Sequence, residues 1–232
     1  MTADLPIPLL EGLATTRAIR RFRDEPIPDT DLNQILWHAT RAPSGSNRQP
    51  FRFIVLRDGP VAIDARRVLG QTFRAMWADK RAADAYGTGS GTDATSPKAR
   101  MAETMQHFVD HFEATPVVVL ACIKRDREPG PTEGASIYPA CQNLLLAARA
   151  LGYGGVMTTW HALAEPALRP LLGLPDTVGI SAILALGRPA GHHGPVRRRP
   201  IGELVYDDRW EGPATWAHDP EGTRHTAAGP RR

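Results

Sequence analysis

The sequence predicts α-helices packed against a β-sheet. Three short apolar runs are rich in β-branched or aromatic residues, and Gly or Pro bounds each of them, which is typical of buried strands. These predicted strands cover residues 51–56, 117–123 and 180–186. Stretches of helical character lie around them, at about 29–41, 61–84, 97–113 and 134–151. A chain of 232 residues with 42% hydrophobic content can bury a core of this kind.

The first predicted helix covers residues 29–41. Apolar residues recur at i, i+3, i+4 and i+7 from Leu32 to Ala39, directly after Pro28-Asp29-Thr30, which is a helix start signal. The helix ends before the turn-forming residues 43–45. One face of this helix is therefore expected to pack on the core.

The last predicted helix, 134–151, is apolar on nearly all sides between Tyr138 and Leu151. Such a helix is buried on most sides. A central helix packed on the sheet and a helix in the seam of a homodimer explain this pattern equally well.

Two segments lack this periodicity. Residues 85–96 are rich in Gly, Ser and Thr and predict a flexible insertion between two helices, either a mobile lid or a plain linker. Residues 211–232 form a C-terminal tail that we expect to lie outside the core.

Composition excludes several classes of protein. No stretch reaches 18 uninterrupted apolar residues, and Asp4 and Glu11 interrupt the N-terminus where a signal peptide has its apolar run. We therefore expect a soluble, cytoplasmic protein. The net charge of +3 is too small to indicate general nucleic-acid binding.

The residues that most often bind metals give no metal site. Cys122 and Cys141 lie in apolar surroundings without metal-ligand spacing and are expected to be core residues. His192 and His193 have no third ligand at useful spacing, so a surface turn is expected there.

Arginines are concentrated near both ends of the chain, at 17–23 and at 197–199. Arg17 and Arg20 are three residues apart, so on a helical turn both side chains can bind one phosphate. A solvated charged face is the alternative. The segment 41–51 combines a helix stop with uncharged polar side chains before a strand, and either binds a planar heterocycle or caps its own backbone.

Several segments together resemble the nitroreductase family. They are TRAIRRF at 16–22, EPIP at 25–28, APSGSNRQPF at 42–51, CQNLLLAA at 141–148, LGYG at 151–154, ALGRP at 185–189 and RRPI at 198–201. They occur in the family's order over roughly residues 12–210. The resemblance implies one α+β domain over 1–210, with a central mixed or antiparallel sheet between layers of helices. It also implies an obligate homodimer that binds two FMN molecules at the subunit interface.

The resemblance further assigns residues to FMN. The implied cofactor-binding residues are Arg17, Ala18, Arg20, Pro43, Ser44, Gly45, Asn47, Met157, Thr158, Thr159 and Arg198. Arg17 and Arg198 would hold the phosphate, and residues 43–45 would line the isoalloxazine of the partner subunit's FMN. Thr16 and Ala18 stand where the family often has Arg and Ser, so this chain has one cation and one hydroxyl fewer there. Arg198 or Arg199 is expected to compensate.

The implied activity is hydride transfer through FMN. NADPH or NADH would donate, and a nitroaromatic or quinone would accept in a ping-pong cycle, without a catalytic acid or base from the protein. Arg74 and Arg81 near the insertion favour NADPH. The expected substrate pocket contains Ser46, Phe73, Trp77, Tyr86 and Phe108. Phe73 and Trp77 are equally well explained as core residues.

Three alternatives remain open. Two are flavoenzymes of the same fold, a dehalogenase and a dimethylbenzimidazole-forming enzyme. The dehalogenase would need a clamp of Glu, Tyr and Lys, for which Glu103, Tyr86 and either Lys80 or Lys98 are available. The third is a non-catalytic protein that binds nucleic acid or an acidic partner through its two arginine groups.

Overall fold

The computed structural model describes residues 7–222 and contains one four-stranded sheet. The strands are β1 (Phe51–Leu56), β2 (Val117–Lys124), β3 (Gly154–Thr158) and β4 (Val178–Gly187). Their order is β1-β2-β4-β3, and each neighbouring pair is antiparallel. Of the mixed and antiparallel sheets that were expected, the described residues form the antiparallel one.

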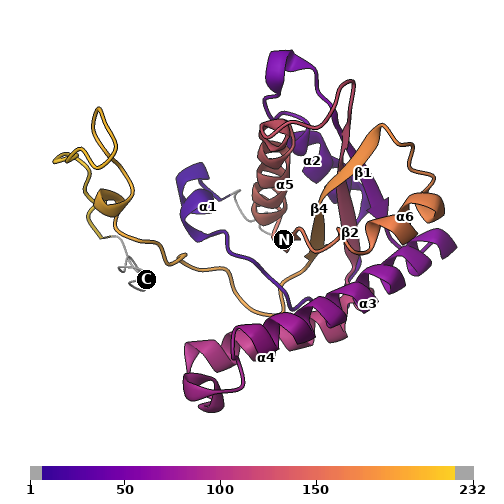
Figure 1. Ribbon diagram of the computed structural model, residues 1–232, viewed down its shortest axis with the longest axis horizontal. Helices are drawn as coiled ribbons and strands as arrows, with labels where there is room; N and C mark the ends of the chain where they lie inside the picture. Colours follow the sequence, from indigo (N-terminus) through magenta and orange to yellow (C-terminus); the bar gives the residue numbers. More distant parts are fainter. Residues whose placement is uncertain (1–6, 223–232) are drawn as a thin grey trace, which may run out of the picture.

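The helices cover both faces of this sheet (Figure 1). They are α1 (Leu9–Thr15), α2 (Asp29–Ala39), α3 (Pro60–Ala83), α4 (Pro97–Asp110), α5 (Tyr138–Ala150) and α6 (Glu165–Leu172). Because side chains alternate along a strand, Val117 and Val119 of β2 join the core beneath α2 and α5. Val118 and Leu120 join a second core with α3, α4 and α6. The result is the expected three-layer α+β fold.

The three strands and four helices predicted from the sequence are present. Helix α5 begins only at Tyr138, after a short 3-10 turn at Glu133–Ser136. It is the central helix, and Cys141 and Leu144 at its middle are fully buried. Cys122 is buried on the opposite face of the sheet, and burial raises the pKa of each of the two thiols to about 12. Both cysteines are therefore unreactive core residues, as predicted.

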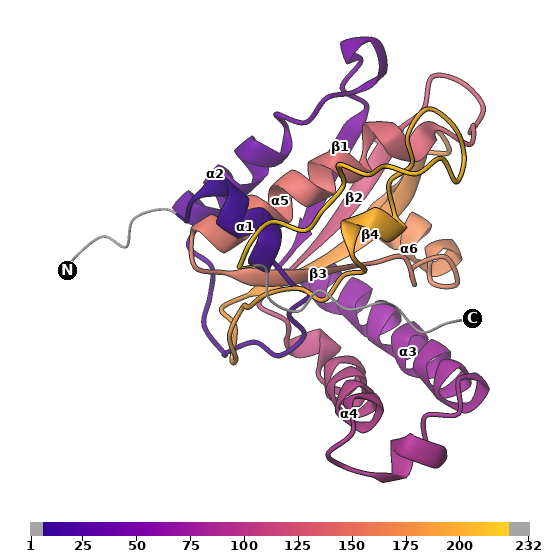
Figure 2. The ribbon, with the colours of Figure 1, turned by 90° about the vertical axis from the view of Figure 1, so that its left-hand side faces the viewer.

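Helices α3 and α4 form a hairpin that extends beyond the sheet (Figure 2). The insertion at 85–96 connects them and contains a 3-10 turn at Gly89–Thr92. Ser96 caps α4 by accepting a hydrogen bond from the Ala99 N–H (3.0 Å), and its hydroxyl donates to the Ser90 carbonyl (2.5 Å). These contacts give the end of the insertion a defined conformation.

The chain leaves the sheet after β4 and runs past α1 as an extended arm (Figures 1 and 2). We call residues 188–222 the C-terminal arm. The Val196 N–H donates to the Ala14 carbonyl (3.2 Å), and a short 3-10 turn follows at Ile201–Glu203. Of the predicted tail at 211–232, residues 223–232 lie outside the described residues.

Within residues 7–222, no helix has both the length and the apolar character needed to span a membrane.

Candidate functional site

The N-terminal arginine group lies along β3. The Ile19 N–H donates to the Gly155 carbonyl (2.9 Å), which fixes the backbone between Arg17 and Arg20. Gly154 makes this approach possible, because a Cβ there would lie 2.7 Å from Ile19 Cγ1. The two arginines are thus held beside the strand that ends at Thr158.

Arg20 is a half-buried cation without a partner. Its guanidinium makes no hydrogen bond or ion pair within the described chain, while burial, followed by the charge of Arg17, lowers its pKa. Arg20 lines a cavity of about 540 Å³ together with Phe108 and His107. A desolvated, unpaired cation is unfavourable unless an anion binds to it.

Other polar atoms near this group also lack partners. Thr16 Oγ1, Arg149 Nε and His193 Nδ1 are buried, and none makes a hydrogen bond to a described residue. Burial lowers the pKa of His193, and the charges of Arg149 and Arg17 lower it further. His193 is half-buried and contacts the Tyr153 carbonyl through Nε2 (3.1 Å), so of the two histidines in the predicted surface turn only His192 is exposed. Unsatisfied polar atoms beside cations are typical of an anion site.

The C-terminal arm brings Arg198 to the same side of the molecule. The bond between Val196 and Ala14 places the arm beside the segment that leads into Arg17. Arg198 is exposed and donates to the Arg197 carbonyl (2.7 Å). The fold therefore brings the two arginine groups, which are far apart in the sequence, to the same side of the molecule.

The predicted flavin-contacting loop has an unusual backbone. Ser46, Asn47 and Gln49 all have φ between 50° and 52°, a left-handed conformation that is costly for residues other than Gly. Two hydrogen bonds hold the loop in this shape: Gln49 N–H donates to Ser44 Oγ (2.9 Å) and Gly45 N–H donates to Ser136 Oγ (3.1 Å). Strain of this kind is concentrated at functional sites.

This loop lies at the opposite end of the sheet from the arginine group. Phe51, at the start of β1, pairs with Ile123, which pairs with Gly179. Residues 16–20 adjoin Gly155, whose partner Leu186 lies at the other end of β4. Figures 1 and 2 both show this separation. One copy of the chain therefore does not bring residues 43–47 to Arg17 and Arg20.

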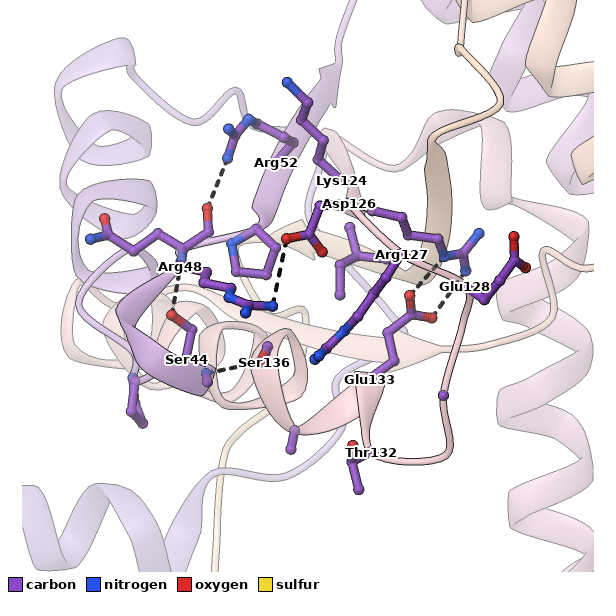
Figure 3. Close-up of a pocket in the computed structure, with 18 residues that line it drawn as sticks. Ser44, Arg48, Arg52, Lys124, Asp126, Arg127, Glu128, Thr132, Glu133 and Ser136 are labelled. Atoms are coloured by element: carbon purple, nitrogen blue, oxygen red, sulfur yellow. Dashed lines mark hydrogen bonds and ion pairs between the residues drawn. The ribbon is translucent and has the colours of Figure 1, made fainter.

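Residues 43–45 line a cavity of about 850 Å³, which we call the loop cavity. Its other wall is the end of β2 and the connection to α5, within residues 123–136. Figure 3 shows side chains from both walls pointing into it. Gln49 and Ser136 shape this cavity. Gln49 lies within the quoted motif without an assigned role, and no sequence signal identifies Ser136.

The end of β3 carries the remaining predicted flavin contacts. Met157 is exposed, and Thr158 pairs with Ile183 of β4. Thr158 Oγ1 accepts a hydrogen bond from the Trp160 N–H (3.4 Å), and Thr159 is exposed. Because Ile19 adjoins Gly155, these residues and the arginine group belong to one edge of the sheet.

The predicted substrate-pocket residues occupy different environments. Phe73 and Trp77 are buried in the core with α3, α4 and α6. Tyr86 packs its ring on Trp77, and Phe108 lines the cavity that contains Arg20. Ser46 is exposed on the strained loop. Phe108 thus lies near the predicted cofactor residue Arg20, and Ser46 lies between Gly45 and Asn47 in the loop, whereas Phe73 and Trp77 are core residues.

Arg149 and His193 had no role in the sequence prediction. Arg149 is the only cation of the central helix between Tyr138 and Ala150. The mostly apolar composition of this helix gave no reason to expect a functional role for it. Its position is defined only by the fold, which brings the end of α5 close to His193, so that both line a cavity of about 260 Å³.

Comparison with known proteins identifies the class. The nitroreductase family matches residues 13–188, and the chain belongs to this family. An NADH dehydrogenase of Thermus thermophilus is 30% identical over 215 residues, which cover 88% of this chain and 98% of the relative. A protein of Desulfovibrio desulfuricans, solved in complex with FMN, is 28% identical with a TM-score of 0.61 and covers 88% of this chain and 98% of its own.

Two further relatives carry the names of the alternatives expected from the sequence. An iodotyrosine deiodinase of Thermotoga neapolitana is 27% identical and covers 78% of this chain and 89% of the relative. A 5,6-dimethylbenzimidazole synthase of Rhodospirillum rubrum is 28% identical and covers 81% of this chain and 82% of the relative. The family to which the chain belongs thus includes relatives with each of these activities.

Proposed function

We propose that the protein binds FMN and uses NADPH or NADH to reduce nitroaromatic or quinone acceptors. The observation that carries this proposal is Arg20, a half-buried cation with no partner among the described residues, next to a second cation, Arg17. The phosphate or the electron-rich edge of a flavin satisfies such a group. The relative solved with FMN and the relative named for NADH support the choice of cofactor and donor.

The residues at the β3 edge fit FMN. Arg17 and Arg198 would bind the phosphate, with the unpaired Thr16 hydroxyl as an additional donor. These groups offset the Arg and Ser that the chain lacks at Thr16 and Ala18. Thr158 and Thr159 would lie along the ring.

A second copy of the chain would complete this site. Residues 43–47 lie too far from Arg17 and Arg20 to contact the same flavin within one copy, as the register of the sheet requires. The C-terminal arm exposes Trp210 and Trp216, which are 80% and 61% accessible. Exposed aromatic side chains on an arm are typical of an interface. We infer a homodimer in which each loop 43–47 contacts the partner's flavin.

The protein's contribution to the reaction is binding and electrostatics. When bound, FMN supplies the hydride chemistry, accepting two electrons from the nicotinamide and passing them to the acceptor. Arg20 would stabilise negative charge at the flavin ring, and the walls around Phe108 would exclude water. No side chain is needed as a general acid or base.

The test is spectroscopic. The purified protein should show flavin absorbance, and anaerobic NADH or NADPH should bleach it, with recovery on adding a nitroaromatic or a quinone. The Arg198→Ala variant should retain less FMN than the wild type. A colourless protein that binds no added FMN would refute the proposal, and undiminished FMN affinity in Arg198→Ala would refute the role of Arg198.

Reductive dehalogenation is the second candidate, because of one feature of the α3–α4 hairpin. Tyr86 and Glu103 line a common cavity of about 540 Å³, and Lys98 Nζ lies 5.7 Å from the centre of the Tyr86 ring. Glu103 is paired with Arg21 (2.8 Å), so a zwitterionic substrate would have to displace that arginine. Halide release from an iodotyrosine by the dithionite-reduced protein would favour this candidate over nitro or quinone reduction.

A further inference from the structure

The loop cavity contains more positive than negative side chains. Its cations are Arg48, Arg52, Lys124, Arg125 and Arg127, and its carboxylates are Asp126, Glu128 and Glu133. Arg125 and Glu133 form an ion pair with two hydrogen bonds, of 2.7 and 3.0 Å, so their charges cancel. The remaining side chains leave the cavity with an excess of positive charge.

Two of these cations are available to a ligand. Arg127 makes no ion pair or hydrogen bond in the described part of the chain. Arg48 has only an exposed ion pair with Asp126 at 3.5 Å, a type of contact that contributes little. Figure 3 shows both side chains entering the space beside Ser44 and Ser136, whereas Lys124 and Arg52 point away from it.

Two hydroxyl groups complete the donor set. Ser44 Oγ and Ser136 Oγ each accept a backbone hydrogen bond, from Gln49 and Gly45, and neither donates to a described residue. Two guanidinium groups and two free hydroxyl protons around one space match the acceptor oxygens of a phosphate dianion. The hydrogen bonds that Ser44 and Ser136 accept from the backbone of Gln49 and Gly45 hold the two hydroxyl groups in place.

We propose that the loop cavity binds the 2′-phosphate of NADPH and makes NADPH the preferred donor. This inference rests on the proposed function, because residues 43–45 form both a wall of the cavity and the predicted contact to the partner's flavin. A nicotinamide stacked on that flavin would direct its adenosine end into the loop cavity. NADH lacks the phosphate that Arg48 and Arg127 would hold.

The experiment compares both donors on the FMN-loaded protein. The wild type should show a kcat/KM for NADPH at least about tenfold above that for NADH. Arg127→Gln and Arg48→Gln should each lower the NADPH value about tenfold through KM and leave the NADH value unchanged. Arg67→Gln, which removes an exposed arginine of α3 outside the cavity, is the matched control.

A binding measurement accompanies the kinetics. Adenosine 2′-monophosphate should bind to the wild-type protein by titration calorimetry at least about tenfold more tightly than adenosine 5′-monophosphate, and Arg127→Gln should remove this difference. The inference would be overturned if the wild type used both donors equally well, or if the variants lost activity equally with both donors. In either case a bound flavin that the donors reduce would still support the proposed function. A preparation that binds no FMN would overturn both.

Discussion

At the scale of single residues, the proposed flavin-binding role of Arg20 conflicts with the stability of the fold. Its guanidinium is desolvated, lies near Arg17 and has no partner among the described residues, so the protein without FMN keeps a destabilising charge there. Residues at binding sites commonly show this conflict.

We therefore predict opposite effects for Arg20→Met on stability and on binding. Without FMN, the variant should be more stable by about 1 kcal/mol, a rise in Tm of about 2–4 °C at fixed protein concentration. Its affinity for FMN should fall at least about tenfold. Differential scanning calorimetry and fluorescence titration with FMN measure these effects. Arg21→Met, at an exposed arginine paired with Glu103, is the control and should leave FMN affinity unchanged.

Tyr153 links α2 to the start of β3, and this link depends on pH. Its buried hydroxyl donates to Asp31 Oδ2 (2.6 Å), and burial, then the hydrogen bond to Asp31, raises the pKa of Tyr153 from 10.0 to about 12. Because the folded-state pKa is the higher one, the stabilisation is complete below pH 10 and is lost as the pH rises towards about 12.

Tyr153→Phe should accordingly lower the free energy of unfolding by about 1–2 kcal/mol at pH 8. The difference from the wild type should shrink between pH 10 and about 12, where the wild-type hydroxyl ionises. Urea denaturation at several pH values measures it, with Tyr206→Phe on the exposed arm as control. A difference that stays constant over this range would show that the hydroxyl contributes nothing through its protonation.

At the scale of elements, the glycines of β3 allow residues 16–20, the proposed phosphate-binding segment, to pack closely against this strand. A Cβ on Gly154 would meet Ile19 Cγ1 at 2.7 Å and Pro189 Cγ at 3.0 Å. Gly154→Val should thus push the arginine segment off the strand. We predict a loss of stability of about 1–3 kcal/mol together with weaker FMN binding.

The control for this prediction is Gly59→Val. Gly59 precedes α3 with an extended backbone, and a Cβ added there would have no atom within 4 Å. Chemical denaturation and FMN titration should show almost no change for this variant. If Gly154→Val lost stability but kept the wild-type affinity for FMN, β3 would hold the sheet together without positioning the arginines.

The elements that the sequence predicts well are those with strong patterns. The apolar run of β1 gave its bounds correctly, since Phe51–Leu56 lies between turn residues on both sides. In contrast, β3 begins with two glycines and has only five residues, so it has no apolar run to detect. Helices α1 and α6 have only seven and eight residues, which is too short to show a helical repeat of apolar residues, so they were not predicted.

The candidate site was predictable as far as local motifs extend. The motif at 42–51 indicated the loop correctly, but the left-handed backbone of Ser46, Asn47 and Gln49 is imposed by bonds to Ser44 and Ser136. A partner as distant in sequence as Ser136 has no local signal. The same holds for His193 and Arg149, whose proximity depends on how α5 and the C-terminal arm meet.

At the scale of the whole molecule, the C-terminal arm leaves large apolar side chains exposed that contacts within one chain do not cover. Trp210, Trp216 and Leu204 are 80%, 61% and 56% accessible, and α1 beside the arm exposes Leu10 at 78%. Strand β1 is also an edge strand in the described sheet, with one side unpaired. Apolar side chains and a free strand edge are together what a second copy of the chain would cover.

We predict that removing residues 201–232 abolishes both dimerisation and FMN binding. The shortened chain keeps all four strands and both cores, so circular dichroism should still show a folded protein. Light scattering should report a monomer where the full chain is a dimer. FMN should dissociate, because residues 43–47 of the partner would no longer reach the flavin at Arg17 and Arg20.

A second variant tests whether the apolar side chains of the arm, and not merely the presence of the arm, are needed for dimerisation. Trp210→Ser with Trp216→Ser keeps the arm but removes its two most exposed apolar side chains. This variant should shift the dimer towards monomer at low protein concentration and release FMN in parallel. The two transitions should coincide on dilution, since each flavin needs both copies. A truncated protein that remains dimeric would show that the arm does not form the interface, and a monomer that retains FMN would show that the site is complete within one chain.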